Sequence, residues 1–159
     1  MMKVWITTVG TSPFAVINTL WAACELEGYV PEKVYFVYND KMAQNLEINK
    51  KWILRLTGEY GKPALIIEMK CDEEDFQSYS RLIHSLIFNE KKDGNTVAID
   101  ITPGRKIMSA FCMFHGLSEG GADRVYYMHL DDVKKYEGKS FIEIPAGEHK
   151  LINMKEIVG

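Results

Sequence analysis

Short apolar runs recur along the chain, separated by longer segments of mixed polarity. The runs are rich in β-branched and aromatic residues and are nearly continuous rather than alternating. That pattern is typical of strands buried on both faces of a parallel sheet. The runs that we interpret as strands cover residues 4–9, 34–38, 64–67, 97–101 and 125–128.

The segments between these runs have the length and spacing of helices. Apolar residues recur every three or four positions in 14–24 and 76–87, and more loosely in 41–57, which is closed by Gly58. The segment 107–117 is apolar almost all round. It is therefore either a central helix within one chain or a helix covered by a second subunit.

Strands that alternate with helices predict an α/β fold, a doubly wound, mainly parallel Rossmann-like sheet in the order 3-2-1-4-5. The pattern changes after residue 130, where 140–144 and 150–154 flank a turn that contains Pro145 and Gly147. This arrangement predicts a C-terminal β-hairpin. We expect one domain, with an α/β core over 1–130 and a hairpin extension over 131–159.

Composition narrows the class of partner. The 159 residues are 47% hydrophobic and 26% charged with a net charge of −3, so we expect a globular domain that does not hold long nucleic acid. No apolar run approaches the ~18 residues that a spanning helix needs, so no membrane partner is expected. The three cysteines lack metal-ligand spacing, which favours a reduced, cytoplasmic setting with no metal and no cofactor.

Two strand-to-helix junctions share one pattern. Each has a hydroxyl residue directly before a proline, in Ser12-Pro13 and in Thr102-Pro103. A serine or threonine N-cap with proline at the first helical position is a strong start signal for a helix. The simpler interpretation is that both pairs are caps and nothing more.

The same two junctions also have features of a phosphate site. Each contains a glycine, Gly10 or Gly104, that lets a bound group approach the backbone. Strands one and four are neighbours at the switch point of the predicted order, where ligands bind, and helix N-termini offer free N–H groups to phosphate. Arg105 and Lys106 stand where the helix dipole disfavours cations, unless an anion lies between. No GxGxxG or GxxxxGK[ST] motif is present, so neither NAD nor a P-loop nucleotide is indicated.

Together the junctions resemble the CRISPR-associated Rossmann-fold family, known as CARF domains. The resemblance rests on TTVGTSPFAV and DITPGRKIMSAF and extends in outline over residues 1–130. The second stretch resembles the family block Asp-x-Thr-x-Gly-x-Lys-x-Met, filled here by Asp100, Thr102, Gly104, Lys106 and Met108. The effector domain that usually follows a CARF domain is not expected here.

The resemblance implies a homodimer that binds a cyclic oligoadenylate across its two-fold axis, with cyclic tetra-adenylate as the first expectation. Some stand-alone members are ring nucleases, which cut the ring and switch off type III CRISPR signalling. The residues that would line the ring are Gly10, Thr11, Ser12, Thr102, Pro103, Gly104, Arg105 and Lys106, with Asn39, Asp40, Met128 and His129 near adenine or ribose.

The expected chemistry is attack of a ribose 2′-hydroxyl on the adjacent phosphorus, which needs no metal. Lys106 would stabilise the transition state, Ser12 would orient the hydroxyl or a phosphate oxygen, and Arg105 would hold a phosphate. His129 is the histidine to test as an acid or base, although a loop histidine is the simpler interpretation. The alternative functions are a non-catalytic sensor that acts through a partner, and an enzyme that acts on a mononucleotide.

Overall fold

The computed structural model describes residues 1–72 and 74–158 and contains a six-stranded sheet in the order β3-β2-β1-β4-β5-β6. The first five strands are parallel, and β6 runs antiparallel to β5. The predicted α/β, doubly wound, mainly parallel sheet is therefore confirmed. The strands are β1 (Lys3–Thr8), β2 (Lys33–Tyr38), β3 (Leu65–Lys70), β4 (Thr96–Asp100), β5 (Arg124–Leu130) and β6 (His149–Asn153).

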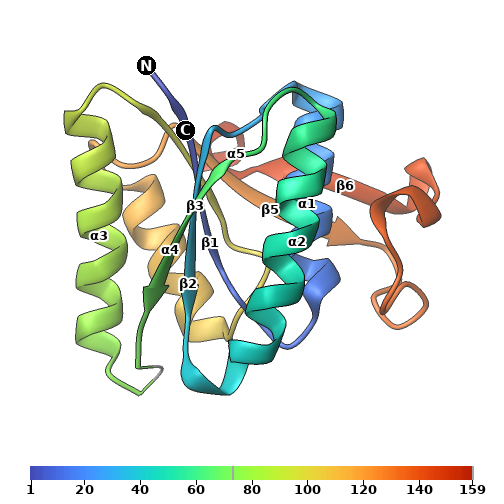
Figure 1. The fold of residues 1–159 in the computed structure, drawn as a ribbon, viewed down its shortest axis with the longest axis horizontal. Helices are drawn as coiled ribbons and strands as arrows, with labels where there is room; N and C mark the ends of the chain where they lie inside the picture. Colours follow the sequence, from blue (N-terminus) through green and yellow to red (C-terminus); the bar gives the residue numbers. More distant parts are fainter. Residues whose placement is uncertain (73, 159) are drawn as a thin grey trace.

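Helices cover both faces of the sheet. Figure 1 shows α1 and α2 on one side and α3 and α4 on the other. The helices are α1 (Pro13–Glu27), α2 (Ala43–Glu59), α3 (Phe76–Lys92), α4 (Lys106–Leu117) and the short α5 (Met154–Val158), with 3-10 turns η1 (Asp40–Met42), η2 (Phe141–Glu143) and η3 (Ala146–Glu148). None of the helices in 1–72 and 74–158 is long and apolar enough to cross a membrane.

The two faces of the sheet carry separate apolar clusters, because successive strand residues point to opposite sides. Trp5 packs with the α1 and α2 cluster, where its ring stacks on Tyr126 at 5.6 Å between centroids. Val4 and Ile6, on either side of Trp5, belong to the cluster under α3 and α4. Burial on both faces explains why the strand runs are nearly continuous in hydrophobicity.

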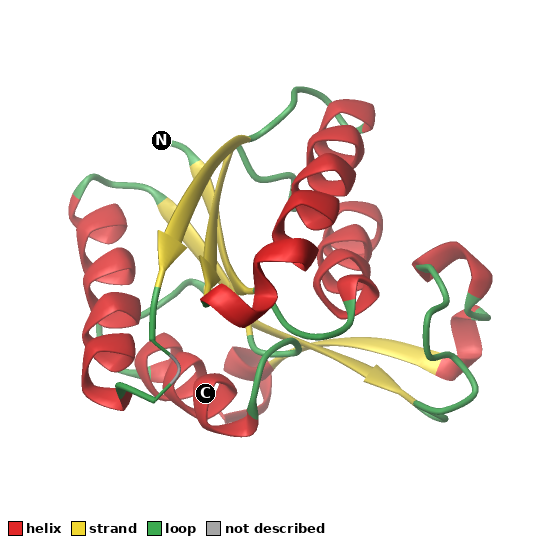
Figure 2. Ribbon diagram, turned by 60° about the horizontal axis from the view of Figure 1, so that its bottom comes forward, coloured by secondary structure: helices red, strands yellow, loops and turns green. Residues whose placement is uncertain are grey.

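The C-terminal hairpin differs from the prediction. Residues 140–144, expected as its first strand, contain the 3-10 turn η2. The strand β6 pairs instead with β5, from Tyr126 opposite Asn153 to Leu130 opposite His149. Figure 2 shows this pair extending beyond the other strands to the connection formed by residues 131–148.

Local hydrogen bonding and burial explain why 140–144 does not extend. Ser140 and Glu143 form a capping box that closes the turn on itself. The Phe141 side chain is buried in a small cluster with Ala22 and Met128. The apolar residues of this segment therefore anchor the connection to α1 and β5 rather than pairing as a strand.

Replacing Gly116 by alanine is expected to destabilise the fold. An added Cβ would lie 2.8 Å from Cγ2 of Val125 and 3.0 Å from Cγ2 of Ile99, so α4 would have to move off the sheet. We expect the free energy of unfolding to fall by about 1–2 kcal/mol, after the helix-propensity gain of alanine is counted. Urea denaturation measures this, with Gly61→Ala as control because nothing lies within 4 Å of its added Cβ. Equal stability of the two variants would contradict the packing.

Candidate functional site

The two junctions meet at the carboxyl edge of the sheet. Gly10, after β1, is buried, and a Cβ added to it would lie 2.9 Å from the backbone nitrogen of Gly104, after β4. Gly104 has a φ of 88°, a conformation that favours glycine. The two loops can therefore approach this closely because Gly10 carries no side chain, whereas a Cβ on Gly104 would face Thr8 Cγ2 at 3.2 Å.

The converged loops form one wall of a cleft of about 310 Å³. It lies where the winding of the sheet reverses, the position at which open α/β sheets bind ligands. Eight of the residues expected at the site line this cleft: Gly10, Thr11, Ser12, Asn39, Thr102, Pro103, Gly104 and Arg105.

The first junction has the expected helix start. Ser12 is the N-cap of α1 and Pro13 occupies the first turn, but the Ser12 side chain makes no capping hydrogen bond. The Ser12 hydroxyl is therefore not used to cap α1. Ser12 is one of the residues that line the cleft.

At the second junction the predicted cap is wrong. The N-cap of α4 is Arg105, and the helix begins at Lys106. Thr102 lies in the loop before it, where its Oγ1 accepts hydrogen bonds from the Met128 backbone nitrogen at 2.9 Å and from the Thr19 hydroxyl at 3.1 Å. This threonine ties the loop to β5 and α1, and the turn at Gly104 delays the helix.

The two cations stand at the start of α4, as expected, and both are exposed. Arg105 lines the cleft, whereas Lys106 lies outside its lining. In the described part of the chain, no hydrogen bond or ion pair joins the Lys106 side chain to another residue. This exposed lysine, at the start of α4 and next to Arg105, is available to an anion held between the two loops.

Asn45 is a positioning residue that the sequence did not reveal. It lies on α2, and its Nδ2 donates to the carbonyl oxygens of Gly10 at 2.9 Å and Thr11 at 3.1 Å. These bonds fasten the first loop to a neighbouring helix. A single polar residue in a loosely periodic helix gives no signal of this role.

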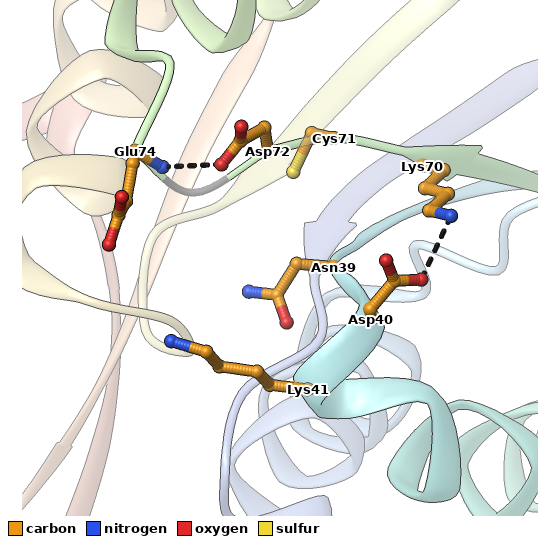
Figure 3. A pocket seen from close by; sticks show the side chains of 7 residues that line it. All are labelled: Asn39, Asp40, Lys41, Lys70, Cys71, Asp72 and Glu74. Atoms are coloured by element: carbon orange, nitrogen blue, oxygen red, sulfur yellow. Dashed lines mark hydrogen bonds and ion pairs between the residues drawn. The ribbon is translucent and has the colours of Figure 1, made fainter.

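A second cavity of about 600 Å³ continues from the cleft along the ends of β2 and β3. Asn39 belongs to both, and its side chain caps η1 by accepting from the Met42 backbone nitrogen. Asp40 lies in this cavity and is paired with Lys70 at 2.9 Å. Figure 3 shows Asn39, just after β2, and Lys41, on η1, on one side of this cavity and Asp72 and Glu74 on the other. No group of three or more potential metal ligands was found in 1–72 and 74–158.

The two expected residues of β5 lie apart from the cleft. Met128 is buried, and its backbone nitrogen is the donor to Thr102 described above. The His129 side chain is half-exposed, with its Nε2 3.5 Å from the Asp131 carboxylate. The structure thus brings eight expected residues into the lining of the cleft, and Asp40, Lys106, Met128 and His129 lie outside that lining.

A buried carboxyl lies directly beneath the second loop. Asp100 ends β4 and is 1% exposed; its Oδ1 accepts from the Thr102 backbone nitrogen at 2.9 Å. The Thr7 hydroxyl faces its other oxygen at 3.5 Å. Burial raises the pKa of Asp100 from 3.8 to about 7, against the opposing effect of these hydrogen bonds.

Asp100→Asn is expected to change how stability depends on pH. Between 3.8 and about 7 the folded protein holds a proton on Asp100 that the unfolded chain has released, so this group's contribution falls as pH rises. Asparagine does not titrate, so the variant should gain stability relative to the wild type as pH rises from about 4 to about 7. Urea denaturation across this range measures the difference. A difference independent of pH would contradict the raised pKa.

No curated protein sequence matches the chain. Csm6 from Enterococcus italicus, solved bound to cyclic hexa-2′-fluoro-hexa-dAMP, superposes with a TM-score of 0.57 at 17% identity and covers 83% of this chain. A type III CRISPR defence DNA nuclease activated by cyclic oligoadenylate gives a TM-score of 0.54 at 18% identity over 80% of this chain.

These two structural similarities show that the chain shares its fold with a part of each protein. The matched part is only 34% of the Csm6 chain and 19% of the nuclease chain, so both relatives are much longer proteins. The sequence match is more specific, because residues 66–156 fit the family model described as CRISPR-associated protein NE0113. That match includes the second junction and covers more than half of the chain, and the protein belongs to the CRISPR-associated protein NE0113 family.

Proposed function

We propose that the protein binds a cyclic oligoadenylate across a homodimer interface and cleaves it, switching off type III CRISPR signalling. Cyclic tetra-adenylate is the expected ring. The observation that carries the proposal is the convergence of the Gly10 and Gly104 loops into one cleft at the starts of α1 and α4. Two longer proteins of the same fold support it, one solved with a cyclic oligonucleotide bound and one activated by cyclic oligoadenylate.

The cleft suits a phosphodiester. Backbone N–H groups at two helix N-termini carry partial positive charge and favour an anion between them. Arg105 can add paired N–H donors to a phosphate, and the exposed Lys106 adds a positive charge next to it. Because the whole chain has a net charge of −3, its overall charge does not attract an anion. The anion would be attracted by the positive groups gathered at the cleft.

A homodimer would supply two copies of the cleft, and a cyclic oligoadenylate with two-fold symmetry needs two matching binding surfaces. A two-fold axis supplies one copy of each loop from each chain, matched to a ligand with its own symmetry. The helix α4 begins at the cleft and leaves Ile107 40% and Phe114 67% exposed, an apolar face on the outside of one chain. Pairing of two chains along α4 would cover these side chains and place the two clefts side by side.

The proposed reaction is a transesterification within the ring. A ribose 2′-oxygen loses its proton and bonds to the adjacent phosphorus, while the bond from phosphorus to the 5′-oxygen breaks and that oxygen takes up a proton. The product is a linear oligoadenylate with a 2′,3′-cyclic phosphate end. Ser12 would orient the hydroxyl or a phosphate oxygen, Arg105 would hold the phosphate, and Lys106 would stabilise the charge that develops on it.

Incubation of the purified protein with cyclic tetra-adenylate in EDTA tests this function. Linear products with a cyclic phosphate end would support cleavage. Tight binding of an intact ring would contradict cleavage and identify a sensor that acts through a partner. Failure to bind any cyclic oligoadenylate would overturn the proposal as a whole and favour a mononucleotide ligand.

Lys106→Ala is expected to lower the cleavage rate about a hundredfold or more, the usual effect of removing one group that stabilises transition-state charge. Ring binding should weaken far less, because the backbone N–H groups and Arg105 remain. Single-turnover cleavage and equilibrium binding separate the two effects. The matched control is Lys51→Ala, an exposed lysine on α2 away from the cleft. Normal cleavage by Lys106→Ala would remove Lys106 from the mechanism.

Gly10→Ala is expected to weaken ring binding about tenfold or more, a loss of at least about 1.4 kcal/mol. The added Cβ would lie 2.9 Å from the Gly104 backbone nitrogen, so the two loops must separate and the cleft must change shape. Calorimetric titration measures the affinity, with Gly147→Ala as control because nothing lies within 4 Å of its added Cβ. Unchanged affinity in a folded Gly10→Ala protein would show that the ring does not sit between these loops.

A further inference from the structure

The Tyr79 hydroxyl connects the two junctions from inside the fold. Tyr79 belongs to α3, and its hydroxyl oxygen lies 2.9 Å from the Thr8 hydroxyl, with either group able to donate. The same oxygen lies 3.2 Å from Cys112 Sγ and 3.5 Å from the Met108 carbonyl oxygen. Thr8 is the last residue of β1, whereas Met108 and Cys112 belong to α4. One oxygen atom therefore contacts both the strand that leads into the first loop and the helix that follows the second.

The Thr8 side chain also contacts the second loop. A Cβ built on Gly104 would lie 3.2 Å from Thr8 Cγ2, and Thr8 itself stands two residues before Gly10. The methyl group of Thr8 thus faces the turn at Gly104, while its hydroxyl bonds to Tyr79. A threonine side chain moves between staggered χ1 rotamers, so the bond to Tyr79 favours the rotamer that keeps the methyl group against this turn.

Burial makes this hydrogen bond effective. Thr8 and Tyr79 are each 2% exposed, so water does not replace either hydroxyl as a partner. A buried hydroxyl that loses its partner is unfavourable, and the surrounding structure shifts to satisfy it. The atoms around this bond are those at the end of β1 and in the first turns of α4. A change at Tyr79 is therefore transmitted to the two loops.

We propose that Tyr79 is a positioning residue for the candidate site, because its hydroxyl fixes the Gly10 loop relative to the start of α4. The effect on catalysis rests on the proposed function. Lys106, the proposed stabiliser of transition-state charge, stands two residues before Met108 in the first turn of α4. Attack of a ribose hydroxyl on phosphorus needs close alignment of the reacting atoms with such groups, so a small displacement lowers the rate more than the affinity.

Tyr79→Phe removes the hydroxyl and keeps the aromatic ring. Single-turnover cleavage of cyclic tetra-adenylate should slow about tenfold or more, while the affinity measured by calorimetric titration should change by less than about twofold. The matched control is Tyr29→Phe. Tyr29 is 1% exposed, and its hydroxyl donates to the carbonyl oxygens of Val4 at 2.8 Å and Thr96 at 3.1 Å, near the starts of β1 and β4.

The two tyrosine variants separate positioning from stability. Each loses one buried hydroxyl, so both should unfold at a lower urea concentration than the wild type. Cleavage should slow in Tyr79→Phe and stay at the wild-type rate in Tyr29→Phe, because the Tyr29 hydroxyl lies at the opposite end of the strands from the cleft. Equal slowing in both variants, or no slowing in Tyr79→Phe, would overturn the inference.

A double-mutant cycle tests whether Tyr79 acts through Thr8. Thr8→Val removes the partner hydroxyl and keeps a branched side chain against the turn at Gly104, so it should slow cleavage to a similar extent. The double variant should be no slower than the slower single variant, because both changes break the same hydrogen bond. Multiplication of the two losses would show that the residues act independently and would overturn the inference.

The position of the loops also has a readout that does not depend on the ring. In ¹⁵N-labelled protein without ligand, Tyr79→Phe should shift the backbone amide signals of Gly10, Gly104 and Lys106, whereas Tyr29→Phe should leave them unchanged. Shifted amides, together with a wild-type protein that neither binds nor cleaves the ring, would support the positioning role and refute the proposed function. Unshifted amides, together with wild-type cleavage of the ring, would overturn the positioning role and leave the proposed function standing.

Discussion

The close approach of Gly10 and Gly104 is the constraint on which the candidate site depends. Two loops that follow neighbouring strands would ordinarily be kept apart by their own side chains. Here a Cβ on the first glycine would lie 2.9 Å from the backbone of the second. Because Gly10 carries no side chain, the starts of α1 and α4 can share one cleft, so that two partial positive charges act on the same place. This contact is why residues of both loops, among them Ser12, Thr102 and Arg105, line one cleft.

Further contacts hold the two loops in place from the sides. Asn45 fastens the first loop to α2 through two carbonyl oxygens. Thr102 fastens the second loop to β5 and α1, and the Thr102 backbone nitrogen donates a hydrogen bond to the buried Asp100 carboxyl. Such a frame keeps the donors oriented before a ligand arrives, which lowers the reorganisation that binding requires.

The features that the sequence predicted correctly are those that follow from periodicity and topology. Strands buried on both faces give continuous apolar runs, and the alternation with helices is enough to place the two junctions side by side. Thr102 shows where such reasoning fails. A hydroxyl before proline predicts a cap, but the positive φ of Gly104 moves the helix start to Lys106 and leaves the threonine to bond with β5 and α1.

The C-terminal part and the supporting polar contacts could not be predicted for a different reason. The segment 140–144 has the composition of a strand, yet the burial of Phe141 and the Ser140–Glu143 capping box make it a 3-10 turn. Asn45 carries no local pattern, because its partners are backbone oxygens distant in sequence. Contacts of this kind depend on tertiary packing, which periodicity does not encode.

The stoichiometry of ring binding tests the central claim most directly. The two converged loops of each chain are proposed to form half of a symmetric site, completed by a second copy across α4. Calorimetric titration of the protein with cyclic tetra-adenylate should therefore saturate at one ring per two chains. Saturation at one ring per chain, or no binding, would contradict a shared site on a two-fold axis.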